Sequence, residues 1–319
     1  MKKKLCKFLI CGVCLVCGIV GVIFTYCNGE NEEKATEGMQ EINIATTTMY
    51  SDQGTSKSSK EMKQKLEVDL WHLMVEDSAQ YQLYVMLPEW DDPLIIGNDL
   101  QSSASIIKLF IMGTAYEMAG RGSLDLDQLI TIHASDMVGG AGVLNGADDG
   151  SAYSVKKLLE LMITESDNTA TNVLMDMIGQ DNIQQFMIEK GCTSSILQRK
   201  MMDFAALKRG RDNYTTAADV GRFFWLLQAE QLTGSQEMLR ILFQQKDCEC
   251  FPKALPDARI AHKTGELVGV YHDAGIVYSQ GKRYILCIMS SGSQNRENTL
   301  ETMRMMAKAV DRELMKNSK

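Results

Sequence analysis

The chain has 319 residues, 45% of them hydrophobic, which is enough for one large mixed α/β domain once the N-terminus is set aside. The formal net charge of −8 repels phosphate backbones, so we do not expect nucleic acid as a partner.

Residues 1–27 are typical of a targeting segment. Four lysines within residues 1–7 precede an uncharged run from Phe8 to Cys27, which just reaches the length of about 20 residues that a membrane-spanning helix needs. The basic flank favours a cytoplasmic N-terminus, and no clear small-residue cleavage site follows. We therefore predict an uncleaved membrane anchor, with a cleaved signal segment as the alternative. Either would place the domain on the extracellular face of the membrane or in the secreted fraction.

Residues 28–63 are rich in Glu, Thr, Ser, Lys and Gly, which is typical of a flexible linker, so we expect the folded domain to occupy 64–319. Apolar residues recur at helical spacing from Leu66 to Met74, and the segments 81–87 and 93–96 read as strands.

A long helical middle follows, up to about residue 245. Strands are predicted near the end at 260–263, 275–278 and 284–289, and a last helix carries apolar residues from Leu300 to Leu314 on one face. This order predicts an α/β (α+β) fold, in which an antiparallel sheet of early and late strands is flanked by helices and the middle forms an all-helical subdomain.

Four cysteines lie beyond the N-terminal segment: Cys192, Cys248, Cys250 and Cys287. The Cys-x-Cys pair at 248 and 250 has no matching partner pair, so zinc is not expected. One disulfide outside the cell and buried free thiols both stay open.

Ser105-Ile106-Ile107-Lys108 is a Ser-x-x-Lys element followed by apolar residues, which predicts a buried helix that starts at or just before Ser105. Residues three apart share a helix face, so the Lys108 amine would lie beside the Ser105 hydroxyl. A desolvated lysine loses its proton more easily and can act as a base. Ser154–Lys157 and Ser279–Lys282 fit the same pattern, so the element alone is weak evidence.

Two further elements follow. Ser166-Asp167-Asn168 lies at a predicted break between two helices, where Ser166 could pass a proton to a leaving nitrogen and Asn168 could bind a substrate amide, although such residues also favour ordinary turns. Lys263-Thr264-Gly265 ends a predicted edge strand, where Gly265 allows close approach of a substrate backbone. His262 should face the opposite side of that strand.

Together, in this order, the Ser-x-x-Lys, Ser-Asp-Asn and Lys-Thr-Gly elements resemble the class A β-lactamase and penicillin-binding protein superfamily over about Leu66 to Lys316. Tyr214-Thr215-Thr216 and the C-terminal helix also look like that family. The resemblance implies a β-lactamase/transpeptidase-like fold, a monomer, and a serine hydrolase without metal or cofactor.

The resemblance also implies residue roles. Ser105 would attack the carbonyl of a β-lactam or of a peptidoglycan stem peptide, with Lys108 as the base. The backbone N–H groups of Ser105 and Glu266 would form the oxyanion hole. Ser166 would protonate the leaving nitrogen, Asn168 would orient the substrate amide, and Lys263, Thr264 and Gly265 would bind the substrate carboxylate.

The sequence departs from the family where deacylation is concerned. We find no Glu-x-x-Leu-Asn element after Ser-Asp-Asn, and in the matching stretch, 199–206, Asp203 is the carboxylate nearest the expected place. An aspartate is one methylene shorter, and misplacing a base by about 1 Å can cost on the order of 100-fold in rate. Arg199 and Asp212 could pair and hold this loop, although surface positions for both are an equal alternative.

An arginine that many family members place near the substrate carboxylate has no clear counterpart. Tyr271 and His272 follow Lys-Thr-Gly, and Arg283 lies on the next strand. Three functions remain in view: a β-lactamase, a D,D-peptidase or penicillin-binding hydrolase with slow deacylation, and a non-enzymatic surface sensor of β-lactams or peptidoglycan.

Overall fold

The computed structural model describes residues 53–316, which belong to one compact unit. The predicted N-terminal segment, 1–27, lies outside the described residues. Within 53–316 no helix is both long and apolar enough to cross a membrane. The first helix, α1 (Gln53–Met74), includes the last residues of the predicted linker, so the expected domain start at residue 64 falls inside a helix.

A five-stranded antiparallel sheet organises this unit, in the order β2-β1-β9-β8-β7. Its strands are β1 (Gln80–Met86), β2 (Leu94–Ile96), β7 (Arg259–Leu267), β8 (Val270–Ser279) and β9 (Lys282–Ser291). Residues 284–290 of β9 are all buried, because this central strand is covered on both faces. The early strand β1 therefore pairs with the last strand, and the predicted closure of the sheet is confirmed.

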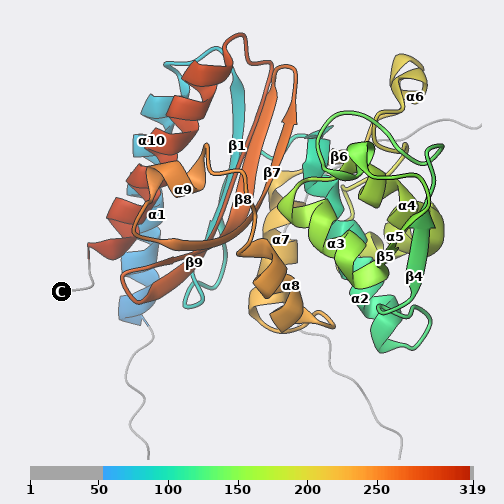
Figure 1. Ribbon diagram of the computed structural model, residues 1–319. Coiled ribbons are helices and arrows are strands. Elements are labelled where there is room, and N and C mark those ends of the chain that lie inside the picture. Colours follow the sequence, from blue (N-terminus) through green and yellow to red (C-terminus); the bar gives the residue numbers. More distant parts are fainter. Residues whose placement is uncertain (1–52, 317–319) are drawn as a thin grey trace, which may run out of the picture. The chain divides into compact units, whose positions relative to one another are not determined.

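Helices cover the two faces of the sheet. On one face α1 packs beside α10 (Arg296–Met315), where Tyr284 of β9 donates a hydrogen bond to Asp311 (Figure 1). On the other face lies α7 (Ala217–Gln228), whose Gly221 sits so close to the Tyr84 ring that an added Cβ would lie 2.3 Å from it. Close packing of this helix on β1 joins the sheet to the helical subdomain.

The middle of the chain forms that subdomain, which lies on the α7 side of the sheet in Figure 1. Its helices are α2 (Lys108–Gly120), α3 (Val155–Thr164), α4 (Asn168–Ile178), α5 (Gln180–Glu189), α6 (Phe204–Lys208) and α8 (Ser235–Leu242). Two short ribbons join them: β3 (Gln101–Ser102) with β6 (Tyr214–Thr215), and β4 (Leu129–Ile132) with β5 (Ser151–Ser154). Two 3-10 turns, η1 (Ala104–Ile107) and η2 (Leu144–Gly146), complete it. The short helix α9 (Phe251–Ala254) lies outside this subdomain and packs against α10 (Figure 1).

Helix caps explain where several helices begin. The Ser154 side chain accepts from the Lys157 backbone N–H and caps α3, so the serine of this second Ser-x-x-Lys match is a helix cap. Thr216 caps α7 in the same way by accepting from the Asp219 N–H, directly after the Tyr-Thr-Thr segment.

The four cysteines of the described residues are free, and all but Cys248 are buried, so the free-thiol alternative holds. Burial raises the pKa of Cys250 and Cys287 well above the ordinary value, which keeps these thiols protonated and inert.

Candidate active site

Ser105 lies on η1, one turn before α2. The predicted helix start is confirmed, although its first turn is a 3-10 helix. The neighbouring Ile106 and Ile107 are fully buried and fix the turn against the core, whereas Ser105 stays half-buried. Ala104 has φ of +44°, a left-handed conformation that a residue with a Cβ rarely adopts. Such strain next to a half-exposed serine is typical of a functional turn.

The Lys108 amine is the centre of the site's hydrogen-bond network. Lys108 is fully buried, and its Nζ donates to the backbone oxygen of Ser166 (2.6 Å), to Ser166 Oγ (3.1 Å) and to Asn168 Oδ1 (3.0 Å). Burial first, and then the charge of Lys263, hold the pKa of Lys108 well below its usual value. Lys108 can therefore exist as a neutral amine, which a base requires.

The Ser166-Asp167-Asn168 segment forms the turn between α3 and α4, as predicted. Ser166 has φ of +52°, which turns its hydroxyl toward the lysines. Asp167 is almost completely buried and caps α4 by accepting from the Ala170 N–H at 2.8 Å. Its other oxygen accepts from the N–H groups of Val143 and Leu144, at 2.6 and 2.8 Å. Asp167 therefore fixes the loop and leaves its two neighbours to face the site.

Lys263 reaches the same hydroxyl from the sheet. Its Nζ donates to Ser166 Oγ at 3.1 Å and to the Thr264 backbone oxygen at 2.8 Å. Burial lowers the pKa of Lys263 to about 8, with Asp247 and Asp273 acting in the opposite direction. A hydroxyl that accepts from two amines has its own O–H free to donate elsewhere. Ser166 can therefore donate its own proton and receive another from a neighbouring lysine amine.

Lys-Thr-Gly lies within β7, which continues to Leu267, so the expectation that it ends the strand is wrong. Pairing with β8 extends the strand over these polar residues. A Cβ added at Gly265 would lie 3.1 to 3.2 Å from Ile106, Ala104 and the Ser103 oxygen, so a larger residue would push β7 and η1 apart by a few tenths of an ångström.

Two buried histidines stabilise β7 and its neighbours, and neither lines the pocket that contains Ser105. His272 Nε2 donates to the Ser102 oxygen at 2.8 Å, its Nδ1 accepts from the Ser290 N–H, and burial lowers its pKa to about 4, so it stays neutral. His262 pairs with the buried Asp273 at 2.8 Å on the face opposite Lys263.

A pocket of about 180 Å³ opens beside Ser105 and brings the motifs together. It is lined by Ala104, Ser105, Gly140, Ala141, Asn168, Arg199, Met201, Met202, Phe204, Leu207, Glu266 and Leu267. Ser105 from η1, Asn168 from α4 and Glu266 from β7 thus share one cavity. Side chains such as Phe204, which is 58% exposed, give its outer rim an apolar character that suits a small organic substrate.

Asp203 is not among these lining residues. Its carboxylate caps α6 by accepting from the Ala206 N–H at 2.8 Å, so the structure assigns it a structural task and does not bring it to the pocket wall. Among the described residues that line this pocket, Glu266 is the only carboxylate. Asp203 as the deacylating base therefore stays a prediction, which the lining of this pocket does not support.

The loop that carries Asp203 is held by the predicted ion pair. Arg199 Nε lies 2.7 Å from Asp212 Oδ1, and both side chains are only 9% exposed. Asp212 also accepts from the Ser102 hydroxyl at 2.7 Å, close to the turn that bears Ser105. The pair is therefore buried structure, and the surface alternative for these two residues is wrong.

One arginine near the site belongs to none of the sequence motifs. Arg296, the first residue of α10, lines a groove together with Thr264, Gly265, Glu266 and Tyr271. It lies 30 residues beyond Glu266, and only the fold brings the two together. Arg283 lies opposite Tyr278 in the strand register, near the start of β9 and remote from Lys263, so it is not part of the site.

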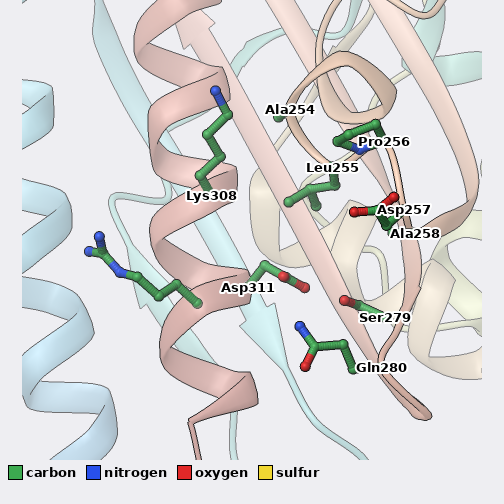
Figure 2. A pocket seen from close by; sticks show the side chains of 10 residues that line it. Ala254, Leu255, Pro256, Asp257, Ala258, Ser279, Gln280, Lys308 and Asp311 are labelled. Carbon is green, nitrogen blue, oxygen red and sulfur yellow. The ribbon is translucent and has the colours of Figure 1, made fainter.

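A separate pocket of about 510 Å³ contains none of the predicted site residues. Figure 2 shows it between α10 and the loop after α9, with Leu255, Lys308 and Asp311 in its wall. Ser279 and Gln280 line it too, at the end of β8 remote from Lys263. Within residues 53–316 no cluster of three or more His, Cys, Asp or Glu could hold a metal ion.

Comparison with known proteins agrees with this geometry. Residues 65–314 match the model of the family described as "Beta-lactamase enzyme family". Among curated proteins, beta-lactamase BRO-1 of Moraxella catarrhalis is 34% identical over 97 residues, which cover 30% of this chain and 31% of that protein.

Solved structures match over most of the domain. PBP-A is 26% identical with a TM-score of 0.73, and the match covers 79% of this chain and 96% of PBP-A. A PBP-A variant solved as an acyl-enzyme complex with penicillin-G is 25% identical, with a TM-score of 0.72, over 81% of this chain and 97% of the other. A beta-lactamase of Sphaerobacter thermophilus is 23% identical, with a TM-score of 0.71, over 77% and 95%, and shows the shared fold alone.

Proposed function

The chain belongs to the beta-lactamase enzyme family, and on this premise we propose that it is a serine hydrolase that β-lactams acylate at Ser105. The observation that carries the proposal is the buried Lys108 amine, which contacts Ser166 and Asn168 one helical turn from Ser105. A serine is a weak nucleophile until a neighbouring base takes its proton, and a lysine of lowered pKa is such a base.

In the proposed acylation, Ser105 Oγ attacks the β-lactam carbonyl carbon while its proton passes to the neutral Lys108 amine. The carbonyl oxygen becomes an oxyanion, which the backbone N–H groups of Ser105 and Glu266 stabilise. When the C–N bond breaks, Ser166 gives its hydroxyl proton to the departing nitrogen and regains one from Lys108. The product is an ester between Ser105 and the opened ring.

The other site residues bind and orient the substrate in this proposal. The side-chain amide of Asn168 hydrogen-bonds the amide of the substrate, and Lys263 and Thr264 bind its carboxylate by charge and hydroxyl. Gly265 lets β7 lie close to η1, so that the substrate is clamped between the strand and Ser105.

For the second half-reaction we propose slow deacylation, as in a penicillin-binding hydrolase. Hydrolysis of the ester needs a base that activates water. Asp203 is engaged as a helix cap, and the Glu266 carboxylate is bound to Arg296. The likeness to PBP-A, a variant of which forms an acyl-enzyme with penicillin-G, supports the same choice. A D,D-peptidase that acts on peptidoglycan stem peptides is therefore the second candidate.

Labelling with a fluorescent penicillin tests the acylation step. Purified full-length protein should carry one label per chain, and Ser105→Ala should carry none. Ser154→Ala is the matched control, because Ser154 belongs to another Ser-x-x-Lys element and serves as a helix cap. It should lose about 1 kcal/mol of stability and keep its label. A wild type that stays unlabelled, or a labelled Ser105→Ala variant, would overturn the proposal.

Stopped-flow mixing with a chromogenic cephalosporin tests the deacylation step. We expect a burst of about one equivalent followed by very slow turnover. Steady turnover without a burst would instead select an efficient β-lactamase.

We further propose that the protein acts at the extracellular face of the membrane, tethered through residues 1–27. Cell fractionation tests this: the full chain should sediment with membranes and resist extraction by salt, whereas recovery in a salt-soluble fraction would contradict it.

A further inference from the structure

Glu266 and Arg296 form a two-point ion pair at the rim of the site. Arg296 Nε lies 2.9 Å from Glu266 Oε1, and Arg296 Nη2 lies 3.0 Å from Glu266 Oε2. This parallel arrangement is the geometry in which a guanidinium binds a carboxylate most specifically. Hydrogen bonding to Glu266 raises the pKa of Arg296 above its ordinary value, so the guanidinium stays charged.

The pair stands between two cavities. Glu266 lines the pocket that contains Ser105 and also the groove that contains Thr264, Gly265 and Arg296. Both side chains remain accessible, at 49% exposure for Glu266 and 43% for Arg296. A group that binds against Thr264 therefore lies next to Arg296, on the side where Glu266 is already bound.

The other charged groups near Arg296 do not replace the positive charge that Glu266 neutralises. Asp247 and Glu249 line the same groove, so its carboxylates outnumber Arg296 there. The Lys263 amine faces Ser166 and the Thr264 oxygen, and it is half neutral near pH 8. A substrate carboxylate that binds here meets a guanidinium whose Nε and Nη2 groups already bind Glu266. It also meets the negative charge of Glu266 itself.

We propose that the Glu266 side chain is a specificity determinant, which by binding Arg296 weakens the preference for a free carboxylate at the end that meets Lys263 and Thr264. Substrates that carry a neutral group there, such as an amide or an ester, are therefore acylated at rates closer to those of the corresponding free carboxylates. The inference rests on the proposed acylation at Ser105 and adds the substrate class to it. It concerns the side chain alone, so Glu266→Gln leaves the backbone N–H of residue 266 in place.

The test compares a penicillin that has its free carboxylate with the methyl ester of the same penicillin. The second-order rate constant of acylation is measured for both with full-length protein, and their ratio is the readout. Both constants come from the same sample, so a loss of folded protein cancels in the ratio. Glu266→Gln should raise the carboxylate-to-ester ratio by about five- to tenfold, because an accessible ion pair of this kind contributes on the order of 1 kcal/mol.

Glu297→Gln is the matched control, since it removes the same charge from an exposed glutamate that is paired with a different arginine, Arg304. It should leave the ratio within about twofold of wild type. Adding Arg296→Gln to Glu266→Gln should return the ratio toward the wild-type value, because the gain depends on the freed guanidinium.

The outcomes separate the two proposals. A wild type that neither compound acylates overturns the proposed function and this inference with it. Acylation at Ser105 with an unchanged ratio in Glu266→Gln, or an equal rise in Glu297→Gln, overturns the inference and leaves the proposed function standing.

Discussion

At the residue scale, the chemistry depends on two buried amines that share one hydroxyl. Lys108 and Lys263 each lie 3.1 Å from Ser166 Oγ, one from the helical side and one from the sheet. Two ammonium groups this close repel each other, and after burial the charge of Lys263 is the second cause of the lowered pKa of Lys108. We expect Lys108 to serve as the neutral member and Lys263 as the charged one.

This division predicts a pH dependence. Lys263 has its pKa lowered to about 8, so its positive charge is present below that pH and is lost as the pH rises through it. Acylation by a penicillin with a free carboxylate should therefore fall by several-fold between about pH 7 and 9, whereas acylation by its methyl ester should not fall on that limb. Rate constants measured across this range check it; equal declines for the two compounds would contradict the role of Lys263.

The motif residues could be predicted from sequence because their chemistry is tied to local spacing. Ser105 and Lys108 are three residues apart on a helical turn, and Asp167 directly precedes a helix that needs a cap. Arg296 could not be found in this way. Its partner, Glu266, lies across a two-strand hairpin, and nothing in the residues around Arg296 signals that contact.

At the scale of elements, the contact between β7 and η1 sets the width of the site. The absence of a side chain at Gly265 lets the strand approach the turn that carries Ser105. The sequence suggested that the strand would end at Lys263, since polar residues and a glycine follow. Pairing of β7 with β8 from Arg259 to Leu267 overrides that local preference.

Gly265→Ala should therefore impair acylation more than stability. The new methyl group must displace either η1 or the strand by a few tenths of an ångström. Because a displacement of about 1 Å at a catalytic group can cost on the order of 100-fold in rate, we expect a several-fold loss. Gly146→Ala is the control, because a Cβ there has no atom within 4 Å and its backbone is not left-handed. Labelling rates of the two variants, normalised to folded protein, give the comparison; similar rates would mean that the β7–η1 contact does not set the site.

The loop from Arg199 to Asp212 shows what spacing alone leaves open. The sequence placed Asp203 near the expected position of a base and left the Arg199–Asp212 pair undecided. In the fold the pair is buried, and Asp203 faces the first turn of α6 as its cap. A cap and a base are both carboxylates before a helical stretch, so only the direction of the side chain distinguishes them.

At the scale of the whole molecule, the order of strands along the chain already required a sheet built from both ends of the domain. β1 lies next to β9, and α1 lies next to α10 on the same side of the sheet (Figure 1). Apolar periodicity predicted these elements because each must bury one face. The start of α1 at Gln53 was not predicted, since its first turns are polar and resemble a linker.

The packing of α1 should contribute stability without contributing chemistry. Leu70 is fully buried in the core, whereas Val68 on the same helix is 55% exposed. Leu70→Ala should lower the free energy of unfolding by about 2–5 kcal/mol, and Val68→Ala should change it by less than about 0.5 kcal/mol. Urea unfolding measures both. The acylation rate per folded molecule should stay at the wild-type value in each, and a loss of rate in Leu70→Ala would tie α1 to the site.

The central claim is that an ester forms on the Ser105 oxygen. The most direct measurement is the intact mass of the full-length protein after mixing with benzylpenicillin and rapid acid quenching, followed by peptide mapping of the adduct. We predict a single adduct with the mass of the whole penicillin, since ring opening expels no fragment, located on the peptide that contains Ser105. An unmodified mass at every quench time, or an adduct on any other residue, would contradict the account.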